Sequence, residues 1–114
     1  ERRRMLEEIT ASFPNVRIDS FENRFLVDYA HSVKAGYIVR GIRSVADYEY
    51  EHKLSGMNRH LLPQAETVFL ITADHYSFVS SSLIRETARL GGDVGELVHT
   101  SVKKNLTTKV CTQS

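Results

Sequence analysis

The stretch TVFLI, Thr67 to Ile71, decides the fold, because it is a continuous run of apolar and β-branched residues without a charge. Such a run is typical of a strand that is covered on both faces in a parallel sheet. YIV, Tyr37 to Val39, lies between two glycines and is predicted as a second strand. VRID, Val16 to Asp19, is predicted as a third short strand.

Apolar residues at helical spacing separate and flank these strands. The spacing predicts helices over residues 2–12, 22–34, 45–62 and 82–90, and one or two short helices within residues 94–106. Strands that alternate with helices of ten or more residues predict an α/β fold with a doubly wound parallel sheet. The length fits one domain, residues 1–114, whose polar segment 107–114 is expected to fray.

The composition is that of an ordinary globular protein, with 41% hydrophobic and 25% charged residues and a formal net charge of +1. This charge argues neither for nor against nucleic acid, and neither nucleic acid nor a membrane is among the partners that we expect. No apolar run approaches the roughly 20 residues of a membrane span. The single cysteine, Cys111, excludes an intrachain disulfide and zinc sites built on cysteine pairs, so a cytoplasmic protein is expected.

Three consecutive serines, Ser80, Ser81 and Ser82, stand directly before the predicted helix 82–90. A helix N-terminus offers unpaired N–H groups and about half a positive charge, and phosphate binds there readily. Arg85, one turn into the helix, could reach back toward such an anion. The alternative is that one serine simply caps the helix, and this segment by itself does not decide between the two.

VRGIRSVADYEYE places two arginines, Arg40 and Arg43, around Gly41 at the end of the second predicted strand. Both arginines could form forked hydrogen bonds to phosphate, and Gly41 would allow a sharp turn and the close approach of a ligand. Taken alone, this segment favours two solvated surface arginines. Ligands of parallel sheets bind beyond the carboxyl ends of the strands, where both this loop and the serine segment belong. Together the two loops predict a ligand with several phosphates.

Acidic residues and histidines give weaker signals. Asp47 and Glu49 are interpreted as acids that suit the start of a helix rather than as metal ligands, and Glu51 as a possible acceptor for a ribose hydroxyl. The five histidines lack metal-ligand spacing and are interpreted as surface or packing residues.

Four strings, VRGIRSVADYEYE, MNRHLLP, ETVFL and YSFVSSSLIRETARLGGDV, resemble bacterial phosphopantetheine adenylyltransferases in order and spacing. The resemblance spans about residues 1–106. It implies a Rossmann-like nucleotidyltransferase fold with helices on both faces of a parallel sheet. The implied reaction is adenylyl transfer from ATP to 4′-phosphopantetheine, giving dephospho-coenzyme A and pyrophosphate. It further implies Mg²⁺ with ATP, coenzyme A as a ligand, a role in coenzyme A biosynthesis, and a homo-oligomer, a hexamer.

The same resemblance implies a role for individual residues. Contacts to phosphopantetheine are implied for Leu26, Arg40 and Asn58. Contacts to ATP are implied for Gly41, Ile42, Arg43, Glu51, Tyr76, Ser77, Phe78, Val79, Ser80, Ser81, Ser82 and Arg85.

The chain departs from the family at its start. The family's strand with two histidines separated by a residue and a glycine, and its following lysine, would lie before Glu1, so no catalytic residue is assigned here. We therefore expect the 114-residue chain to be a fragment that lacks a strand–helix–strand unit of about 40 residues. On its own it is expected to be inactive and not a stable monomer. The alternative is a non-catalytic nucleotide- or coenzyme A-binding remnant, or an interaction module.

Overall fold

The computed structural model describes residues 1–113. The chain separates into two compact units: Glu1–Ser20 together with the chain from Val79 onward, and Phe21–Phe78. The expectation of one domain stays a prediction. Within the described residues, no helix is both long and apolar enough to span a membrane.

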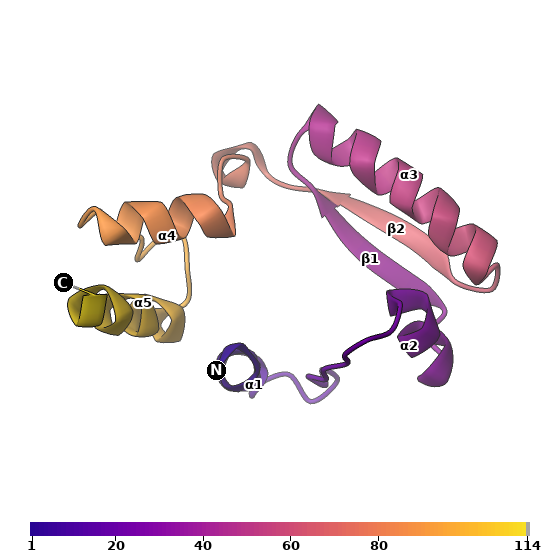
Figure 1. Cartoon of the computed structure of the whole chain (residues 1–114), viewed down its shortest axis with the longest axis horizontal. Coiled ribbons are helices and arrows are strands. Elements are labelled where there is room, and N and C mark those ends of the chain that lie inside the picture. Colours follow the sequence, from indigo (N-terminus) through magenta and orange to yellow (C-terminus); the bar gives the residue numbers. More distant parts are fainter. Residues whose placement is uncertain (114) are drawn as a thin grey trace. The chain divides into compact units, whose positions relative to one another are not determined.

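The unit Phe21–Phe78 is built on two parallel strands, β1 (Tyr37–Ile42) and β2 (Glu66–Ile71). Tyr37 lies opposite Glu66, and the register runs without interruption to Ile42 opposite Ile71. A parallel pair needs a long crossover connection, which is supplied by α3 (Val45–Leu61). Figure 1 shows α3 running along the strand pair, and a short helix, α2 (Leu26–Ser32), before β1. These elements confirm the predicted α/β class and the strands at Tyr37 and Thr67.

The core of this unit lies where α2, β1 and the segment after α3 meet. Its buried members are Val27, Ala30, Ile38, Leu62 and Ala65. These three parts of the chain thus contribute to one small cluster, which fixes the start of β1 against α2 and the segment after α3.

The other face of the strand pair is exposed, and this corrects one expectation from the sequence. Side chains alternate along a strand, so Phe69 turns toward α3 and packs edge-on against Tyr48 at 6.1 Å between ring centroids. Leu70 points the opposite way and is 60% exposed, as is Val39 of β1. The prediction that residues 67–71 are covered on both faces is therefore wrong for this structure, because the described chain covers only one face.

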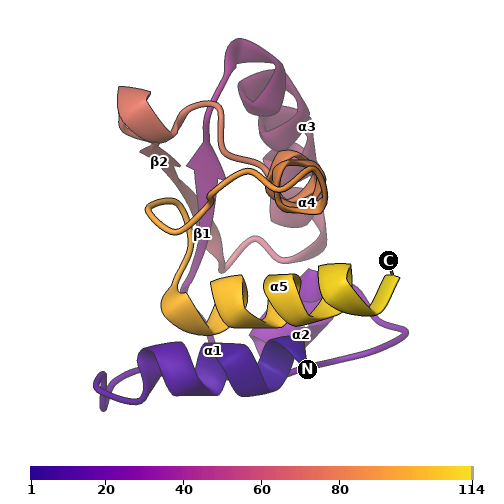
Figure 2. The ribbon, with the colours of Figure 1, turned by 90° about the vertical axis from the view of Figure 1, so that its left-hand side faces the viewer.

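The other unit contains three helices, α1 (Arg2–Thr10), α4 (Ser81–Arg89) and α5 (Thr100–Gln113). α5 contacts both α1 and α4, and Figure 2 shows α1 and α5 side by side. Ile84 of α4 and Val94 in the loop after it are buried, so the amphipathic face of α4 anchors this unit.

The structure lacks one predicted strand, and one predicted helix begins later than expected. Residues 16–19 form no strand, since no strand lies beside them in the described residues to pair with. The helix predicted from residue 22 begins only at Leu26, because Asn23 has a positive φ of 55° and interrupts the helical path.

The last helix also differs from its prediction. It was expected within residues 94–106, but α5 continues to Gln113. The hydroxyls of Thr107 and Thr108 donate to the carbonyls of Lys103 and Lys104 one turn earlier, which satisfies these polar side chains inside the helix. Most of the segment 107–114 is therefore helical, Ser114 lies outside the described residues, and fraying of this segment stays a prediction.

The two faces of β1 should differ in their tolerance of truncation. We expect Ile38→Ala to lower the free energy of unfolding by about 2–4 kcal/mol, because it leaves a cavity in the core. Val39→Ala, next to it on the exposed face, should lower it by less than about 1 kcal/mol. Urea unfolding of both variants measures the difference, and equal losses would show that the exposed face is covered in solution.

Candidate functional site

The site residues predicted from the sequence divide between the two units. The unit Phe21–Phe78 contains Leu26, Arg40, Gly41, Ile42, Arg43, Glu51, Asn58, Tyr76, Ser77 and Phe78. The other unit contains Val79, Ser80, Ser81, Ser82 and Arg85.

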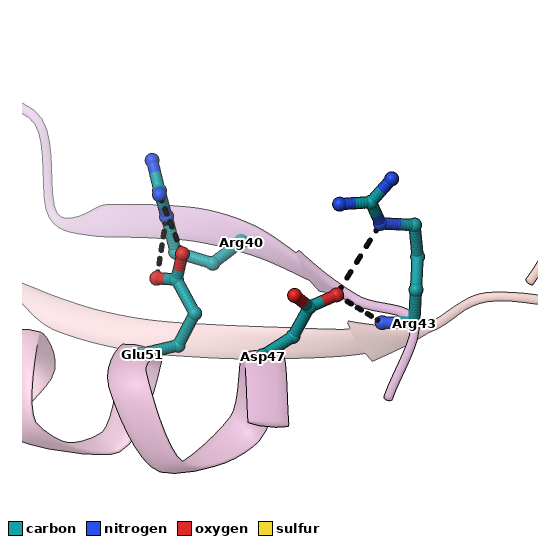
Figure 3. Close-up of polar contacts among 4 residues, drawn as sticks. All are labelled: Arg40, Arg43, Asp47 and Glu51. Atoms are coloured by element: carbon teal, nitrogen blue, oxygen red, sulfur yellow. Dashed lines mark hydrogen bonds and ion pairs between the residues drawn. The ribbon is translucent and has the colours of Figure 1, made fainter. Parts of the chain in front are cut away.

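An ion pair between β1 and α3 is the best-formed polar feature of the strand unit. The Nε–H of Arg40 donates to Oε2 of Glu51 at 2.7 Å, and its Nη2–H donates to Oε1 at 2.6 Å (Figure 3). Both oxygens of one carboxylate therefore hold one guanidinium in the forked geometry that makes such pairs strong. From the sequence, both residues were expected to contact ligands. Their pairing with each other was not predicted.

The fold explains why these two side chains meet. Arg40 alternates with Ile38 and Ile42, so it lies on the face of β1 whose other side chains are buried. Glu51 shares the inner face of α3 with Asp47, Leu54 and Asn58, at spacings of three or four residues, and all three are partly buried. The side chain of Glu51 is only 11% exposed, against 37% for Arg40.

The pair shifts the titration of both partners. The hydrogen bonds from Arg40 hold the pKa of Glu51 below its usual value, although burial and the nearby charge of Asp47 oppose this shift. The same hydrogen bonds to Glu51 raise the pKa of Arg40. Both groups are therefore charged at neutral pH, and removal of Arg40 would leave the carboxylate of Glu51 without compensation in a largely buried position.

The start of α3 holds the second arginine. The Ser44 hydroxyl caps the helix by accepting from the Asp47 N–H at 3.1 Å. Asp47 Oδ2 in turn accepts from the backbone N–H of Arg43 at 3.1 Å and from its Nε–H at 3.3 Å (Figure 3). The interpretation of Asp47 as an acid that serves the helix start is confirmed. Its position also orients Arg43, which the sequence did not predict.

The residues between the two arginines behave differently from the sequence expectation. Gly41 lies inside β1 and has no positive φ, so the sharp turn predicted there is wrong, because the strand simply continues to Ile42. No atom lies within 4 Å of the position that a Cβ would take at Gly41, so the backbone there is open to a ligand. The side chain of Ile42 is buried, which leaves only its backbone for a ligand.

The remaining predicted residues of this unit lie on α2, on α3 and in the segment after β2. Leu26 packs against the core at the start of α2, and Asn58 is partly buried on α3. Tyr76 ends a short 3₁₀ helix, η1 (Asp74–Tyr76), and the Ser77 hydroxyl donates to the Asp74 carbonyl at 2.7 Å. Ser77 thus closes a turn, and Phe78 beside it is exposed.

The three serines have different roles in the other unit. Ser80 is the N-cap of α4, because its hydroxyl accepts from the Leu83 N–H at 3.1 Å. The helix begins at Ser81, one residue earlier than predicted, so the capping interpretation holds for Ser80 alone. Ser81 and Ser82 are exposed residues of the first turn of α4.

A hollow of about 520 Å³ opens beside this helix start. Val79, Ser80, Ser81 and Arg85 line it together with apolar residues of all three helices and of the loop before α5, namely Met5, Leu6, Ile9, Ile84, Val98, Val102 and Leu106. Arg2 and Lys109 also line it, and sequence reasoning did not find them. Lys109 already pairs with Glu1 at 2.9 Å. Arg2 and Arg85 beside a helix N-terminus form an environment that suits an anion.

Across residues 1–113, no three side chains of the His, Cys, Asp and Glu types gather closely enough to hold a metal ion.

The serine roles give a first test. We expect Ser80→Ala to lower the free energy of unfolding by about 1 kcal/mol, because the Leu83 N–H loses its acceptor. Ser81→Ala, which removes no capping bond, should stay within about 0.5 kcal/mol of the unchanged protein. Thermal melts of both variants measure this, and an equal loss in both would contradict the assignment of the cap.

The Arg40–Glu51 pair predicts a specific pH dependence. Because the folded-state pKa of Glu51 lies below the unfolded value of about 4.3, the charged carboxylate stabilises the fold above that pH. The contribution is lost as the pH falls through the lowered folded pKa. At pH 7, Glu51→Gln should therefore be less stable by about 1–3 kcal/mol, a range that allows for the solvent around Arg40.

Below about pH 4 this difference should shrink toward zero. Urea unfolding from pH 7 to pH 3 measures it, with Glu7→Gln as control, since Glu7 forms an exposed pair with Arg3 on α1. A difference that stays constant down to pH 3 would contradict the pairing.

Comparison with known proteins shows the family to which this chain belongs. A model of the family described as cytidylyltransferase-like matches residues 1–87. Phosphopantetheine adenylyltransferases of Burkholderia vietnamiensis and Burkholderia multivorans are each 46% identical over 110 residues, 96% of this chain and 66% of the relative. That of Paraburkholderia phytofirmans is also 46% identical, and the match covers 64% of its length. The chain thus spans slightly less than two thirds of these relatives, and by the match over residues 1–87 it belongs to the cytidylyltransferase-like family.

Proposed function

We propose that the protein carrying this sequence transfers the adenylyl group of ATP to 4′-phosphopantetheine, giving dephospho-coenzyme A and pyrophosphate. The observation that carries the proposal is the 46% identity, over 96% of this chain, to proteins named phosphopantetheine adenylyltransferase. The cytidylyltransferase-like family match supports transfer of a nucleotidyl group.

The reaction needs positioned cations more than it needs covalent chemistry. A phosphate oxygen of 4′-phosphopantetheine attacks the α-phosphorus of ATP in line, the new P–O bond forms, and pyrophosphate leaves with the electron pair of the broken bond. Negative charge develops on the leaving group, and arginines and helix N-termini stabilise such charge. Mg²⁺ enters with ATP, because in nucleotide sites this ion is held largely by substrate phosphates.

The structure supports a division of these tasks among residues. We assign the phosphate of phosphopantetheine to Arg40, whose guanidinium is fixed from one side. Arg43, held at the start of α3, is assigned to ATP. So are Ser81, Ser82 and Arg85, which lie in the first turns of α4. The other proposed contacts to ATP come from Gly41, Ile42, Glu51, Tyr76, Ser77, Phe78, Val79 and Ser80, and those to the pantetheine arm from Leu26 and Asn58.

Assembly and location are part of the same proposal. A homo-hexamer, a cytoplasmic location, and binding of dephospho-coenzyme A and coenzyme A all follow from the resemblance to the adenylyltransferases.

A second candidate is a protein that binds the nucleotide or the coenzyme without catalysis, or an interaction module. We rank it lower because a binding protein has no need of both arginines, Glu51 and the whole serine segment.

Calorimetry and a turnover assay separate the two candidates. ATP, 4′-phosphopantetheine and coenzyme A are each titrated into the protein, and pyrophosphate release is then measured with both substrates present. Binding with turnover supports the adenylyltransferase. Binding of nucleotide or coenzyme A without turnover supports the binding protein, and no binding of any of the three contradicts both.

Arg43 should affect ATP more than phosphopantetheine. Loss of a charged hydrogen bond to phosphate is worth about 1.5–3 kcal/mol, so Arg43→Ala should raise the Michaelis constant for ATP about 10- to 100-fold. Steady-state kinetics measures it. Arg89→Ala serves as the control, because Arg89 lies in the last turn of α4, where it pairs with Glu86. An unchanged Michaelis constant for ATP together with unchanged turnover would contradict the assignment of Arg43 to ATP.

A further inference from the structure

The turn before α2 brings two aromatic rings together. The rings of Phe21 and Tyr29 stack with their centroids 4.8 Å apart and their planes 11° from parallel. Between them Asn23 has a φ of 55°, a left-handed backbone conformation that asparagine adopts more readily than most residues, and this lets the chain fold back. Phe21, before the helix, therefore lies against Tyr29, on the helix, and the two rings form a flat apolar support.

Arg24 lies over this support. Its Cζ atom is 5.9 Å from the centroid of the Phe21 ring and 5.3 Å from that of the Tyr29 ring, which is within the range of a cation–π contact. Arg24 is exposed, and within residues 1–113 its side chain forms no hydrogen bond or ion pair. The rings thus hold the guanidinium in place while its N–H donors stay open to a ligand.

Apolar side chains adjoin these donors at the start of α2. Phe25, the residue after Arg24, is 68% exposed, and Phe21 is 37% exposed. Leu26 is partly buried against the core of the unit. We call Phe21, Arg24, Phe25 and Leu26 the α2 entry surface. A ligand that suits this surface has alkyl groups for the apolar side chains and carbonyl oxygens for the guanidinium.

We propose that Arg24 is a further binding residue for the acceptor substrate, and that its guanidinium donates to amide carbonyl oxygens of the uncharged pantetheine arm. The inference rests on the proposed function for the identity of that substrate. The arm matches the α2 entry surface, because amide groups join its short alkyl segments. The phosphate of the same substrate fits this surface less well, because a single exposed guanidinium in water attracts an anion only weakly.

The fold of the unit places the α2 entry surface near the residue assigned to the phosphate. Leu26 packs against the cluster that contains Ile38. Ile38 lies two residues before Arg40 on the same face of β1, a spacing of roughly 7 Å along a strand. A substrate whose phosphate lies at Arg40 can therefore extend its arm toward Leu26 and Arg24.

Calorimetry on the protein that carries this sequence tests the proposal. In Arg24→Ala, the Kd of 4′-phosphopantetheine and the Kd of pantetheine, which has no phosphate, should both rise about tenfold. The Kd of ATP should change less than about twofold. Arg17→Ala is the matched control, because it removes an exposed arginine from the other unit, and it should change none of the three.

Three outcomes of these titrations would overturn the proposal. A Kd that rises for 4′-phosphopantetheine but not for pantetheine assigns Arg24 to the phosphate, and an equal loss for ATP indicates a general effect of charge. An unchanged Kd for all three ligands shows that Arg24 touches none of them. A thermal melt verifies that each variant folds, and if Arg24→Ala does not fold, Arg24→Gln replaces it with the same expected split between ligands.

A double-mutant cycle shows whether the rings position the guanidinium. Phe21→Leu keeps apolar bulk but loses the ring, so it should raise the Kd of pantetheine about threefold. Arg24→Ala should then have a smaller effect in the Phe21→Leu background than in the unchanged protein. Arg24→Lys, which keeps the charge but not the flat group, should restore little of the affinity lost in Arg24→Ala. Additive effects of the two changes, or full recovery with lysine, would contradict the role of the stacked guanidinium.

A side-chain NMR signal separates this proposal from the proposed function. The Arg24 Nε–H resonance is followed during a titration with pantetheine, which lacks the phosphate that accepts the adenylyl group. A shift in the unchanged protein that Phe21→Leu weakens supports the contact to the arm even if no adenylyl transfer occurs, in which case only the proposed function is wrong. No shift overturns the contact even if turnover with 4′-phosphopantetheine is measured.

Discussion

The parallel pairing of β1 with β2 is the constraint on which the strand unit and its arginines depend. A parallel partner can be reached only by a crossover, so the chain must run back along the strands as α3. That path lays the inner face of α3 against the face of β1 that carries Ile38, Arg40 and Ile42. A carboxylate at position 51 then meets the guanidinium at position 40, and the partly buried ion pair is a direct product of the crossover.

The same crossover explains why the buried carboxylate of Glu51 is compatible with a stable fold of this unit. A buried carboxylate is costly unless it is paired and hydrogen-bonded, and Glu51 has both of its oxygens satisfied. Among the described residues, no buried side-chain nitrogen or oxygen lacks a hydrogen-bond partner. The apolar cluster around Val27 and Leu62 is small. The unit therefore tolerates the charge of Glu51 only because Arg40 pairs with it.

Local patterns predicted the elements well and their contacts poorly. The strand at residues 67–71 and the helix from Val45 were predictable, since apolar runs, the cap at Ser44 and the proline after Leu62 are signals within a few residues. The strand at residues 16–19 was not, because a strand depends on a neighbour that its own sequence does not reveal. The capping role of Ser80 was open because three consecutive serines offer three possible caps, and only the structure shows that the Ser80 hydroxyl accepts from the Leu83 N–H.

The candidate site shows the same limit at the level of chemistry. The resemblance assigned Arg40 to one substrate and Glu51 to another, each as a separate position in the sequence. Eleven residues and a change from strand to helix separate them, so no periodicity in the sequence links them. Their coupling becomes visible only when the crossover brings them within hydrogen-bonding distance.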